Sequence, residues 1–303
     1  MDPVRERRLR VRARIVQAIR AFFVEQGYLE VETPHRVPAP IPEAHIDPVP
    51  CRGGYLHTSP EVCMKRLLAA GLGRIFQVCR CWREGERGRL HLPEFTMLEW
   101  YRTGADYRDL MAECEALIPF VARAVGKGEV LSYQGRRVNA EPPWPRIRVD
   151  DAFEELGGVP VGEAIRSGAF EEILVSRVEP ALAELGRPVF LLDYPLQQGA
   201  LARICPGRPD RVERFELYAG GLELANGFSE LVDPVEQRAR FEAEQEARLR
   251  GGREVAPLPE PFLRDLAGVP PAAGIALGVD RLVMLLADAG AIDEVVAFAP
   301  EDL

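Results

Sequence analysis

The sequence predicts an α/β (α+β) fold in which a mostly antiparallel sheet is flanked by helices. Two observations support this prediction. Strand-like segments follow one another through short turns, as at 214–218 and 222–226, which flank the strong hairpin signal Gly220-Gly221. Segments whose apolar residues recur at helical spacing lie between the strands. Strands that pair through hairpins, with helices between them, give an antiparallel sheet covered by helices.

The elements can be placed in order along the chain. Apolar residues at helical spacing predict a first helix over 7–26, which Gly27 ends. The Pro-rich segment 37–50 is expected as a loop. In the first half of the chain we expect a short strand over 28–32, a helix from Ser59-Pro60 through 68, strands over 75–83 and 94–101, and a helix over 107–125 that Pro119 kinks. A hairpin or surface connection is expected over 126–148, mostly helix over 151–185, and a buried strand over 189–194. The C-terminal part is expected to contain a helix from Asp233-Pro234 to Gly251-Gly252, a strand over 275–279 and a helix over 280–289. No internal repeat or low-complexity linker interrupts them, so one domain over 1–303 is expected.

Composition narrows the class of protein. Hydrophobic residues make up 47% and charged residues 28% of the chain, which is ordinary globular composition. No apolar run approaches the ~20 residues of a membrane helix, and the basic N-terminus lacks the apolar stretch of a signal peptide. We therefore expect a cytoplasmic protein. The net charge of -9 argues against a protein dominated by contacts to a nucleic-acid backbone, although a local basic patch can exist on an acidic protein.

Six cysteines are present, at positions 51, 63, 79, 81, 114 and 205. Without export they are expected to be reduced thiols. Cys79 and Cys81 stand one residue apart on an expected strand, and no second Cys pair nearby completes a zinc site. We interpret them as two small residues that face the core.

The strand over 94–101 is the first segment that suggests chemistry. Residues two apart share a face of a strand, so Phe95, Met97, Glu99 and Tyr101 point one way. At ~3.3 Å per residue, Phe95 and Glu99 are ~13 Å apart, which spans an adenine ring and a cationic side chain. A carboxylate beside a tyrosine hydroxyl is suited to binding an ammonium group. The alternative is an ordinary half-buried strand whose glutamate faces water.

Two carboxylates flank Asn226-Gly227 in the hairpin over 214–231. Glu223 and Glu230 are seven residues apart and face opposite ways on a regular strand, unless a bulge or bend at Gly227 brings them together. Two oxygen ligands near phosphates suit magnesium, which keeps its other positions for water or phosphate. The signal is weak by itself, because paired surface carboxylates are common.

The segment GIALGVDRLVML joins a strand to a helix. It puts Gly278 at the strand end and Arg281 in the first helical turn. Glycine lets a backbone approach a ligand, and a helix N-terminus favours phosphate. A joint of this kind is more often purely structural, so this pattern alone leaves both interpretations open.

The order and content of these segments resemble the three signature motifs of class II aminoacyl-tRNA synthetases. The helix leading into GYLEVETP resembles motif 1, RIFQVCRCWRE through HLPEFTMLEWY resembles motif 2, and GIALGVDR resembles motif 3. With HTSPEVCMKRL and LELANGFSEL, the resemblance is to the lysyl branch and is nearest to the elongation factor P lysyltransferases. It covers essentially the whole chain and is poorest between about 126 and 212.

The resemblance implies roles for individual residues, with ATP and Mg²⁺ as cofactors. Arg83 and Arg281 would be the catalytic residues, Arg83 at the α-phosphate and Arg281 at the adenine and the γ-phosphate. Phe95 would stack on adenine. The residues implied to bind ATP are Arg83, Glu84, Phe95, Glu223, Leu224, Gly278 and Arg281. The implied metal ligands are Glu223 and Glu230. The residues implied to bind the amino acid are Ser59, Glu61 near the amino group, Glu99 and Tyr101 at the side-chain ammonium, Asn226 and Glu230.

Two positions depart from the family pattern. The chain has Arg83-Glu84-Gly85 where the family usually reads Arg-x-Glu, and Leu92 where it usually has Asn before Pro-Glu-Phe. In the family both positions normally contact the nucleotide. The sequence therefore does not decide which residues of this chain make these contacts with ATP. Glu84 or Glu86 would substitute for the displaced acid if the loop bends differently.

The implied reaction is ATP-dependent activation of lysine or (R)-β-lysine as an adenylate, followed by transfer to a lysine of elongation factor P. Two alternatives remain: lysyl-tRNA synthetase activity, and a catalytically weak regulatory paralogue. The motif 1 helix begins within the first ten residues, so no N-terminal anticodon-binding OB domain is expected and tRNA is disfavoured as acceptor. Ala276 stands where lysyl-tRNA synthetases usually have glycine, and the lysyltransferases resemble this chain in carrying alanine.

A symmetric homodimer is also expected from the resemblance. In class II enzymes the motif 1 helix and strand form the two-fold interface. Here the helix carries an apolar stripe of Val11, Ile15, Phe22 and Phe23. The alternative is that this stripe packs only within the monomer.

Overall fold

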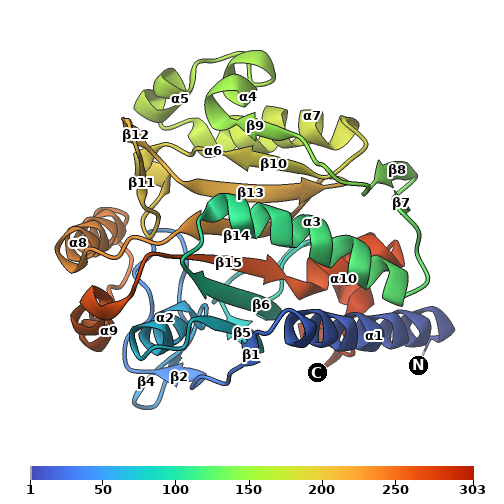
Figure 1. Cartoon of the computed structure of the whole chain (residues 1–303), viewed down its shortest axis with the longest axis horizontal. Helices are drawn as coiled ribbons and strands as arrows, with labels where there is room; N and C mark the ends of the chain where they lie inside the picture. The colour runs from blue at the N-terminus through green and yellow to red at the C-terminus, as the bar shows by residue number, and fades with distance from the viewer. Residues whose placement is uncertain (1) are drawn as a thin grey trace.

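The computed structural model describes residues 2–303 and is built on an eight-stranded sheet (Figure 1). The strand order is β1-β5-β6-β15-β14-β13-β10-β9. Neighbouring strands are antiparallel except at the two edges, where β1 with β5 and β9 with β10 are parallel. The strands are β1 (Leu29–Glu30), β5 (Arg74–Trp82), β6 (Glu94–Thr103), β15 (Ala272–Gly278), β14 (Leu222–Ser229), β13 (Arg214–Ala219), β10 (Val189–Leu192) and β9 (Arg146–Arg148). The expected mostly antiparallel sheet is confirmed.

Ten α-helices and three small sheets surround this sheet in the described part of the chain. The helices are α1 (Pro3–Glu25), α2 (Glu61–Ala69), α3 (Tyr107–Ala124), α4 (Val149–Glu155), α5 (Val161–Ser167), α6 (Phe170–Ile173), α7 (Glu179–Glu184), α8 (Pro234–Arg250), α9 (Glu260–Asp265) and α10 (Val279–Ala287). The small sheets are β2 (Arg36–Val37) with β4 (Gly54–Leu56) and β3 (Pro50–Cys51), β7 (Val130–Tyr133) with β8 (Arg136–Asn139), and β11 (Ile204–Cys205) with β12 (Arg208–Val212). None of the helices in residues 2–303 has the length and apolar character needed to cross a membrane.

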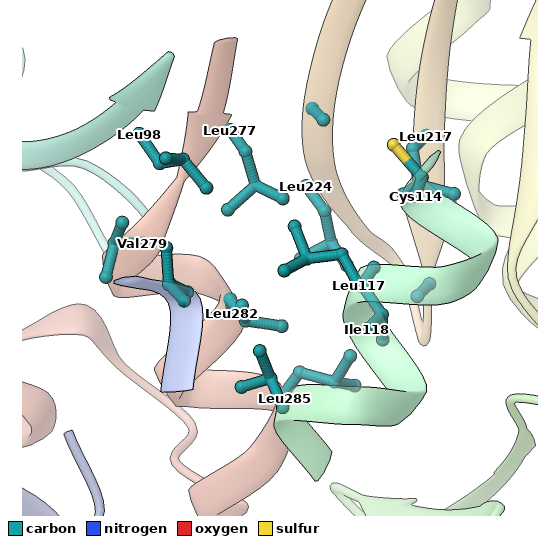
Figure 2. Close-up of a cluster of buried hydrophobic side chains, with 14 of the residues drawn as sticks. Leu98, Cys114, Leu117, Ile118, Leu217, Leu224, Leu277, Val279, Leu282 and Leu285 are labelled. Carbon is teal, nitrogen blue, oxygen red and sulfur yellow. The ribbon is translucent and has the colours of Figure 1, made fainter. Parts of the chain in front are cut away.

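Helices α1, α3 and α10 cover one face of the sheet and bury the main core. Figure 2 shows Leu117 and Ile118 of α3 beside Leu282 and Leu285 of α10, with side chains of the strands behind them. Their helical spacing puts these apolar residues on the face that meets the sheet. Each such side chain, when fully buried, stabilises the fold by roughly 1.5–3 kcal/mol.

The period of two along β6 separates this core from the opposite face. Leu98 and Trp100 are fully buried in the main core. Met97, Glu99 and Tyr101 alternate with them and therefore point to the other side of the sheet. That side is only partly covered, by α2, α8 and α9, which form a separate apolar cluster. The space left there holds the candidate site.

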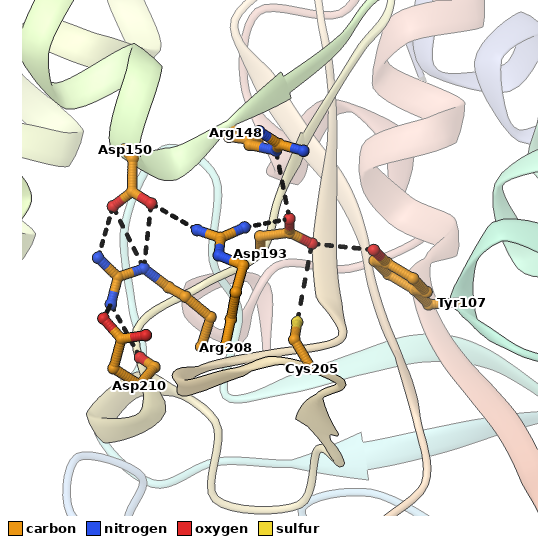
Figure 3. A network of polar contacts seen from close by, with 8 residues as sticks. Tyr107, Arg148, Asp150, Asp193, Cys205, Arg208 and Asp210 are labelled. Atoms are coloured by element: carbon orange, nitrogen blue, oxygen red, sulfur yellow. Dashed lines mark hydrogen bonds and ion pairs between the residues drawn. The ribbon is translucent and has the colours of Figure 1, made fainter.

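A polar network fixes the edge of the sheet beyond β13. Asp193, which follows β10, has a positive φ of 62° and accepts hydrogen bonds from the Tyr107 hydroxyl at 2.9 Å and the Arg208 guanidinium at 2.8 Å. Arg208 and Arg211 also bind Asp150 at the start of α4 (Figure 3). These contacts hold the β11–β12 hairpin against α3 and α4. Neither the hairpin nor β9 was expected from the sequence.

Most other elements lie within a few residues of their expected bounds. The hairpin β7–β8 falls in the segment 126–148, and α8 begins after Asp233, whose side chain accepts from the backbone N–H groups of Val235 and Glu236. Pro119 lies inside α3, which runs as one helix from Tyr107 to Ala124. The segment 37–50 is mostly loop, as expected, with single residues at its ends entering the small β2-β4-β3 sheet. Helix α9 was missed, because Pro-rich flanks hide its six residues.

The apolar stripe of α1 is used within the protomer. Ile15 and Phe23 are completely buried and Phe22 nearly so, against α3 and the sheet. The expected role of this stripe in a dimer interface is therefore wrong for these three residues. Their burial is explained by the monomer alone.

A buried ion pair joins α1 to the sheet and to α10. The Arg12 guanidinium lies 2.5 Å from Asp280 Oδ1 and donates to Thr96 Oγ1 at 2.7 Å. The other oxygen of Asp280 accepts from the Thr96 backbone N–H at 2.6 Å. These contacts connect α1, β6 and α10, which are far apart in the sequence. They also fix the position of the start of α10 relative to β6.

We predict that Arg12→Met lowers the free energy of unfolding by about 3 kcal/mol, because it leaves the Asp280 carboxylate buried without its cation. Urea titration followed by circular dichroism measures the change. The matched control is Arg10→Met on the same helix, whose pair with Glu6 is solvent-exposed. That change should cost less than about 1 kcal/mol. Equal effects of the two substitutions would contradict the role assigned to the buried pair.

Candidate functional site

A cavity of about 490 Å³ lies on the sheet face away from α1 and α3. Its size falls in the range of small-molecule sites. Strands β6, β13, β14 and β15 form the floor, and the loops 41–46 and 197–202 form part of the wall. The expected site residues that line it are Ser59, Glu61, Arg83, Phe95, Glu99, Tyr101, Glu223, Leu224, Asn226, Gly278 and Arg281. The structure therefore brings together nearly all of the residues proposed from the sequence.

Glu99 lies at one end of the cavity and is almost completely buried. Its two carboxyl oxygens accept from Ser59 Oγ at 2.5 Å and from the Tyr101 hydroxyl at 2.7 Å. Burial raises the pKa of Glu99 well above its usual range, and the nearby Glu61 adds to the shift. An ammonium group entering here would stabilise the ionised form and gain a carboxylate partner.

Glu99 differs from the other carboxylates of residues 2–303 that are almost completely shielded from solvent. Each of the others forms an ion pair with a lysine or arginine: Glu61 and Glu230 with Lys65, Asp193 with Arg208, Glu213 with Arg203, Glu216 with Arg214 and Asp280 with Arg12. Glu99 has only the neutral hydroxyls of Ser59 and Tyr101. A buried carboxylate normally needs a cation, and none of the described residues supplies one to Glu99.

Lys65 organises the wall beside Glu99. Its side chain is completely buried, with Nζ 2.5 Å from Glu230 Oε2 and in a second ion pair with Glu61. Burial alone would lower the pKa of Lys65, but the two carboxylates outweigh it and raise the pKa. Lys65 thus stays charged and holds both acids in place. Sequence reasoning missed it, although Glu61 and Lys65 stand at the i,i+4 spacing of helical ion pairs.

Two arginines occupy the opposite end of the cavity. The Arg83 guanidinium lies 5.1 Å from the centre of the Phe95 ring. Arg281 donates to the Glu223 carboxylate at 3.0 Å, and its Nη2 lies 2.7 Å from His91 Nε2. Burial and then Arg281 lower the pKa of His91, so the neutral ring accepts this hydrogen bond. An aromatic ring beside a guanidinium group, with a second guanidinium in the same cavity, is suited to a base with attached phosphates.

The loop after β5 resolves the first departure from the family pattern. Gly85 adopts a positive φ of 74°, and Glu86 lines the cavity 3.7 Å from Arg83. Glu84 is exposed and lies outside the cavity lining. Glu84 therefore does not line the cavity as expected, and Glu86 does, because the turn at Gly85 directs the next side chain inward. Leu92, at the second departure, is buried and contributes an apolar wall.

Glu223 lies on β14 and lines the cavity, whereas Glu230 follows the last residue of that strand and lies outside the lining. The register with β13 shifts so that Leu224 is an extra residue, whereas Gly227 pairs regularly with Phe215 and Ile275. The bulge is thus at Leu224 and not at Gly227. Glu223 contacts Arg281, and the buried Glu230 contacts Lys65. Each of the two acids thus has its own cation partner.

Arg214 and Glu216 also line the cavity, and sequence reasoning missed them. Arg214 donates to Asn226 Oδ1 at 3.2 Å and to Glu216 Oε1 at 2.5 Å. The hydroxyls of Tyr194 and Tyr218 donate to the other oxygen of Glu216. These contacts orient the Asn226 amide. The signal was available, since Arg214, Glu216 and Tyr218 alternate along one strand and share its face.

Cys79 and Cys81 are buried, but they belong to the same sheet face as Glu99. They pack against Phe95 and Met97, their partners on β6, in a small cluster separate from the main core. A hydrogen bond with the Cys81 thiol and a further contribution from His57 lower the pKa of Cys79 to about 6. The interpretation as small residues of the core is therefore incomplete.

These features define the class of protein. A mostly antiparallel sheet carries, on one face, a cavity lined by Arg83, Phe95 and Arg281 and by the buried carboxylate of Glu99. This is the arrangement of a class II aminoacyl-tRNA synthetase catalytic domain.

The comparison with known families agrees. Residues 1–302 match the family described as tRNA synthetases class II (D, K and N), and the chain belongs to this family. It is 41% identical to an elongation factor P--(R)-β-lysine ligase of Vibrio cholerae, over 96% of this chain and 94% of that one. A ligase of the same name from Proteus mirabilis is 42% identical, over 95% of this chain and 93% of that one. A lysine--tRNA ligase of Moorella thermoacetica is 38% identical, over 95% of this chain and 64% of that one.

We predict that Gly278→Ala weakens ATP binding on the order of tenfold, about 1.4 kcal/mol, without loss of stability. A Cβ at 278 would make only ordinary contacts with Arg281, 3.8 Å away, so the fold tolerates it while the cavity narrows. Calorimetric ATP titration and urea unfolding check the two parts. Gly274→Ala on the same strand is the contrast, because its Cβ would overlap the Tyr101 ring and destabilise the fold. An unchanged affinity for ATP in Gly278→Ala would refute the close approach.

Proposed function

We propose that this chain is an ATP-dependent ligase that activates lysine or (R)-β-lysine as an aminoacyl-adenylate and transfers it to a lysine of elongation factor P in the cytoplasm. One catalytic domain spanning the chain would do this. The observation that carries the proposal is Glu99, a buried carboxylate without a cation in the cavity that also holds Arg83, Phe95 and Arg281. The names of the relatives matched along nearly their whole length support elongation factor P as the acceptor.

The first step would be in-line attack of the amino acid carboxylate on the α-phosphorus of ATP. The bond from that oxygen to phosphorus forms as pyrophosphate leaves. Such a step depends on positioning and charge neutralisation and needs no protein nucleophile. Glu99 and Tyr101 would hold the side-chain ammonium, while Arg83 and Arg281 would neutralise the charge that develops on the phosphates.

Magnesium bound with ATP would supply further positive charge at the phosphates. Glu223 fits a metal contact, because its carboxylate is partly exposed, lines the cavity and lies beside Arg281. Glu230 fits less well, because its carboxylate is completely buried and bound to Lys65. We therefore assign Glu223 to the metal, and Glu230, with Glu61 and Lys65, to the wall around the substrate amino group.

The second step would be attack on the adenylate carbonyl by the acceptor amine, with release of AMP. A tRNA acceptor is the main competing proposal, since a lysine--tRNA ligase is also a relative. Ala276 pairs with Glu99 across β15 and β6 and lines the cavity. The methyl group of Ala276 would therefore shape the space for the amino group of β-lysine, which is displaced by one carbon relative to that of lysine. A regulatory protein without catalysis is the third proposal.

A homodimer is also proposed, from the family and no longer from the α1 stripe. Val24 and Leu29 remain well exposed beside β1, the edge strand. An isologous contact there would cover both. Sedimentation at micromolar concentration should give twice the chain mass of 33.7 kDa, and a clean monomer would refute the dimer.

We predict that the protein catalyses lysine-dependent ATP–pyrophosphate exchange. Glu99→Gln should lower kcat/KM for lysine or β-lysine, and the decrease should correspond to a loss of ~3–5 kcal/mol of transition-state binding free energy. Removing the carboxylate leaves the substrate ammonium buried without its partner. Glu94→Gln, an exposed carboxylate on the same strand, is the matched control and should be silent. Arg281→Ala should fail even at saturating lysine. No exchange with any amino acid would favour the regulatory proposal.

The acceptor is predicted to be a protein lysine. The purified chain should transfer labelled (R)-β-lysine or lysine to elongation factor P far more efficiently than to tRNA, when both acceptors are offered in parallel. Mass spectrometry of elongation factor P and acid-precipitable tRNA counts measure the two products. Efficient charging of tRNA with no labelled elongation factor P would overturn the acceptor assignment while leaving lysine activation in place.

A further inference from the structure

His57, Cys79 and Cys81 form a compact cluster beside the cavity. One ligand atom from each residue lies within 4.8 Å of the other two, and all three residues are buried. The two sulfurs are 4.0 Å apart. Two Zn–S bonds of ~2.3 Å at a tetrahedral angle place sulfurs ~3.8 Å apart, so the observed spacing fits a shared metal with little movement.

The backbone holds His57 at this position. The Trp82 N–H donates to the His57 carbonyl at 3.0 Å, and His57 Nε2 lies 2.6 Å from the Arg80 carbonyl oxygen. Cys79 and Cys81 point to the same face of β5, since they are two residues apart on a strand. The histidine is thus fixed alongside the strand that carries both thiols.

The tautomer of His57 leaves one nitrogen free. A carbonyl oxygen only accepts, so Nε2 carries the proton that it donates to Arg80. Nδ1 then keeps its lone pair, and it is buried without a hydrogen-bond partner. Metal-binding histidines commonly have this pattern, with one nitrogen on a backbone carbonyl and the other on the metal.

We propose that His57, Cys79 and Cys81 bind a thiophilic cation, with Zn²⁺ as the best fit, at a site separate from the ATP phosphates. Imidazole and thiolate ligands select zinc over magnesium or calcium, which require oxygen. Three protein ligands leave a fourth position for water. The occupied site would tie the segment leading to Ser59 onto β5, and Ser59 is a hydrogen-bond partner of Glu99.

A disulfide is the other chemistry that two close thiols offer. Residues i and i+2 of a strand are ~6.6 Å apart at Cα, which is near the upper limit for a disulfide. The geometry therefore favours a shared metal over a bond between the sulfurs.

The test uses the full chain, reduced and stripped with chelator, and Co²⁺ as the spectroscopic probe. One equivalent of Co²⁺ should give thiolate-to-cobalt charge-transfer absorption, which oxygen ligands at the nucleotide site cannot produce. Zn²⁺ should displace it, and excess Mg²⁺ should not. Cys79→Ser, Cys81→Ser and His57→Asn should each lose the band or weaken it strongly. Cys51→Ser, a cysteine outside the cluster, should keep it.

A second measurement covers variants that fail to fold. In the wild-type chain, stoichiometric Zn²⁺ should protect Cys79 and Cys81 from alkylation under conditions that open the fold partially, as mapped by peptide mass spectrometry. Absence of the charge-transfer band in the wild type, its persistence in the Cys79→Ser, Cys81→Ser double variant, or protection of other cysteines instead would overturn the proposal. A Cys79–Cys81 disulfide formed in the presence of Zn²⁺ would overturn it as well.

Discussion

The need to pair every buried carboxylate with a cation governs this structure. Asp280 is paired with Arg12, Glu230 with Lys65 and Glu216 with Arg214. The first two pairs each join elements that are far apart in the sequence. A buried charge without a partner costs several kcal/mol, so such pairs are specific even where they add little net stability. Glu99 has no cation of its own in residues 2–303. Its hydrogen bonds in the described residues come from the neutral hydroxyls of Ser59 and Tyr101.

The same constraint explains why the site lies on one face of one sheet. A strand alternates its side chains, so β6 can place Leu98 and Trp100 in the core while Glu99 and Tyr101 face the cavity. The core packing of α1, α3 and α10 therefore fixes the height and direction of the Glu99 carboxylate. Asp280 has a similar effect at the other end of the cavity. Its hydrogen bond with the Thr96 N–H fixes the position of the start of α10 relative to β6, and therefore the position of Arg281.

Much of this arrangement could be predicted from the sequence, because its signals are local. Alternation along 94–101 placed Phe95 and Glu99 on one face, and the Gly220-Gly221 turn placed the β13–β14 hairpin. The bulge at Leu224 could not be placed, since neither its sequence nor that of Gly227 decides which residue is extra. Lys65 and Arg214 were missed because their partners Glu230 and Glu216 become buried only in the folded chain. The exposure of Glu84 depended on a single turn at Gly85.

The site formed by His57, Cys79 and Cys81 could also not be predicted from local sequence spacing. Sequence spacing alone gave Cys79 and Cys81 two ligands and no third, which argued against a metal. The third group, His57, comes from a segment more than twenty residues earlier and reaches β5 through backbone hydrogen bonds to Arg80 and Trp82. Such a contact is invisible to spacing within one strand. Cys79 and Cys81 pair across the sheet with Met97 and Phe95, which both line the cavity, so the cluster lies directly beside the cavity floor.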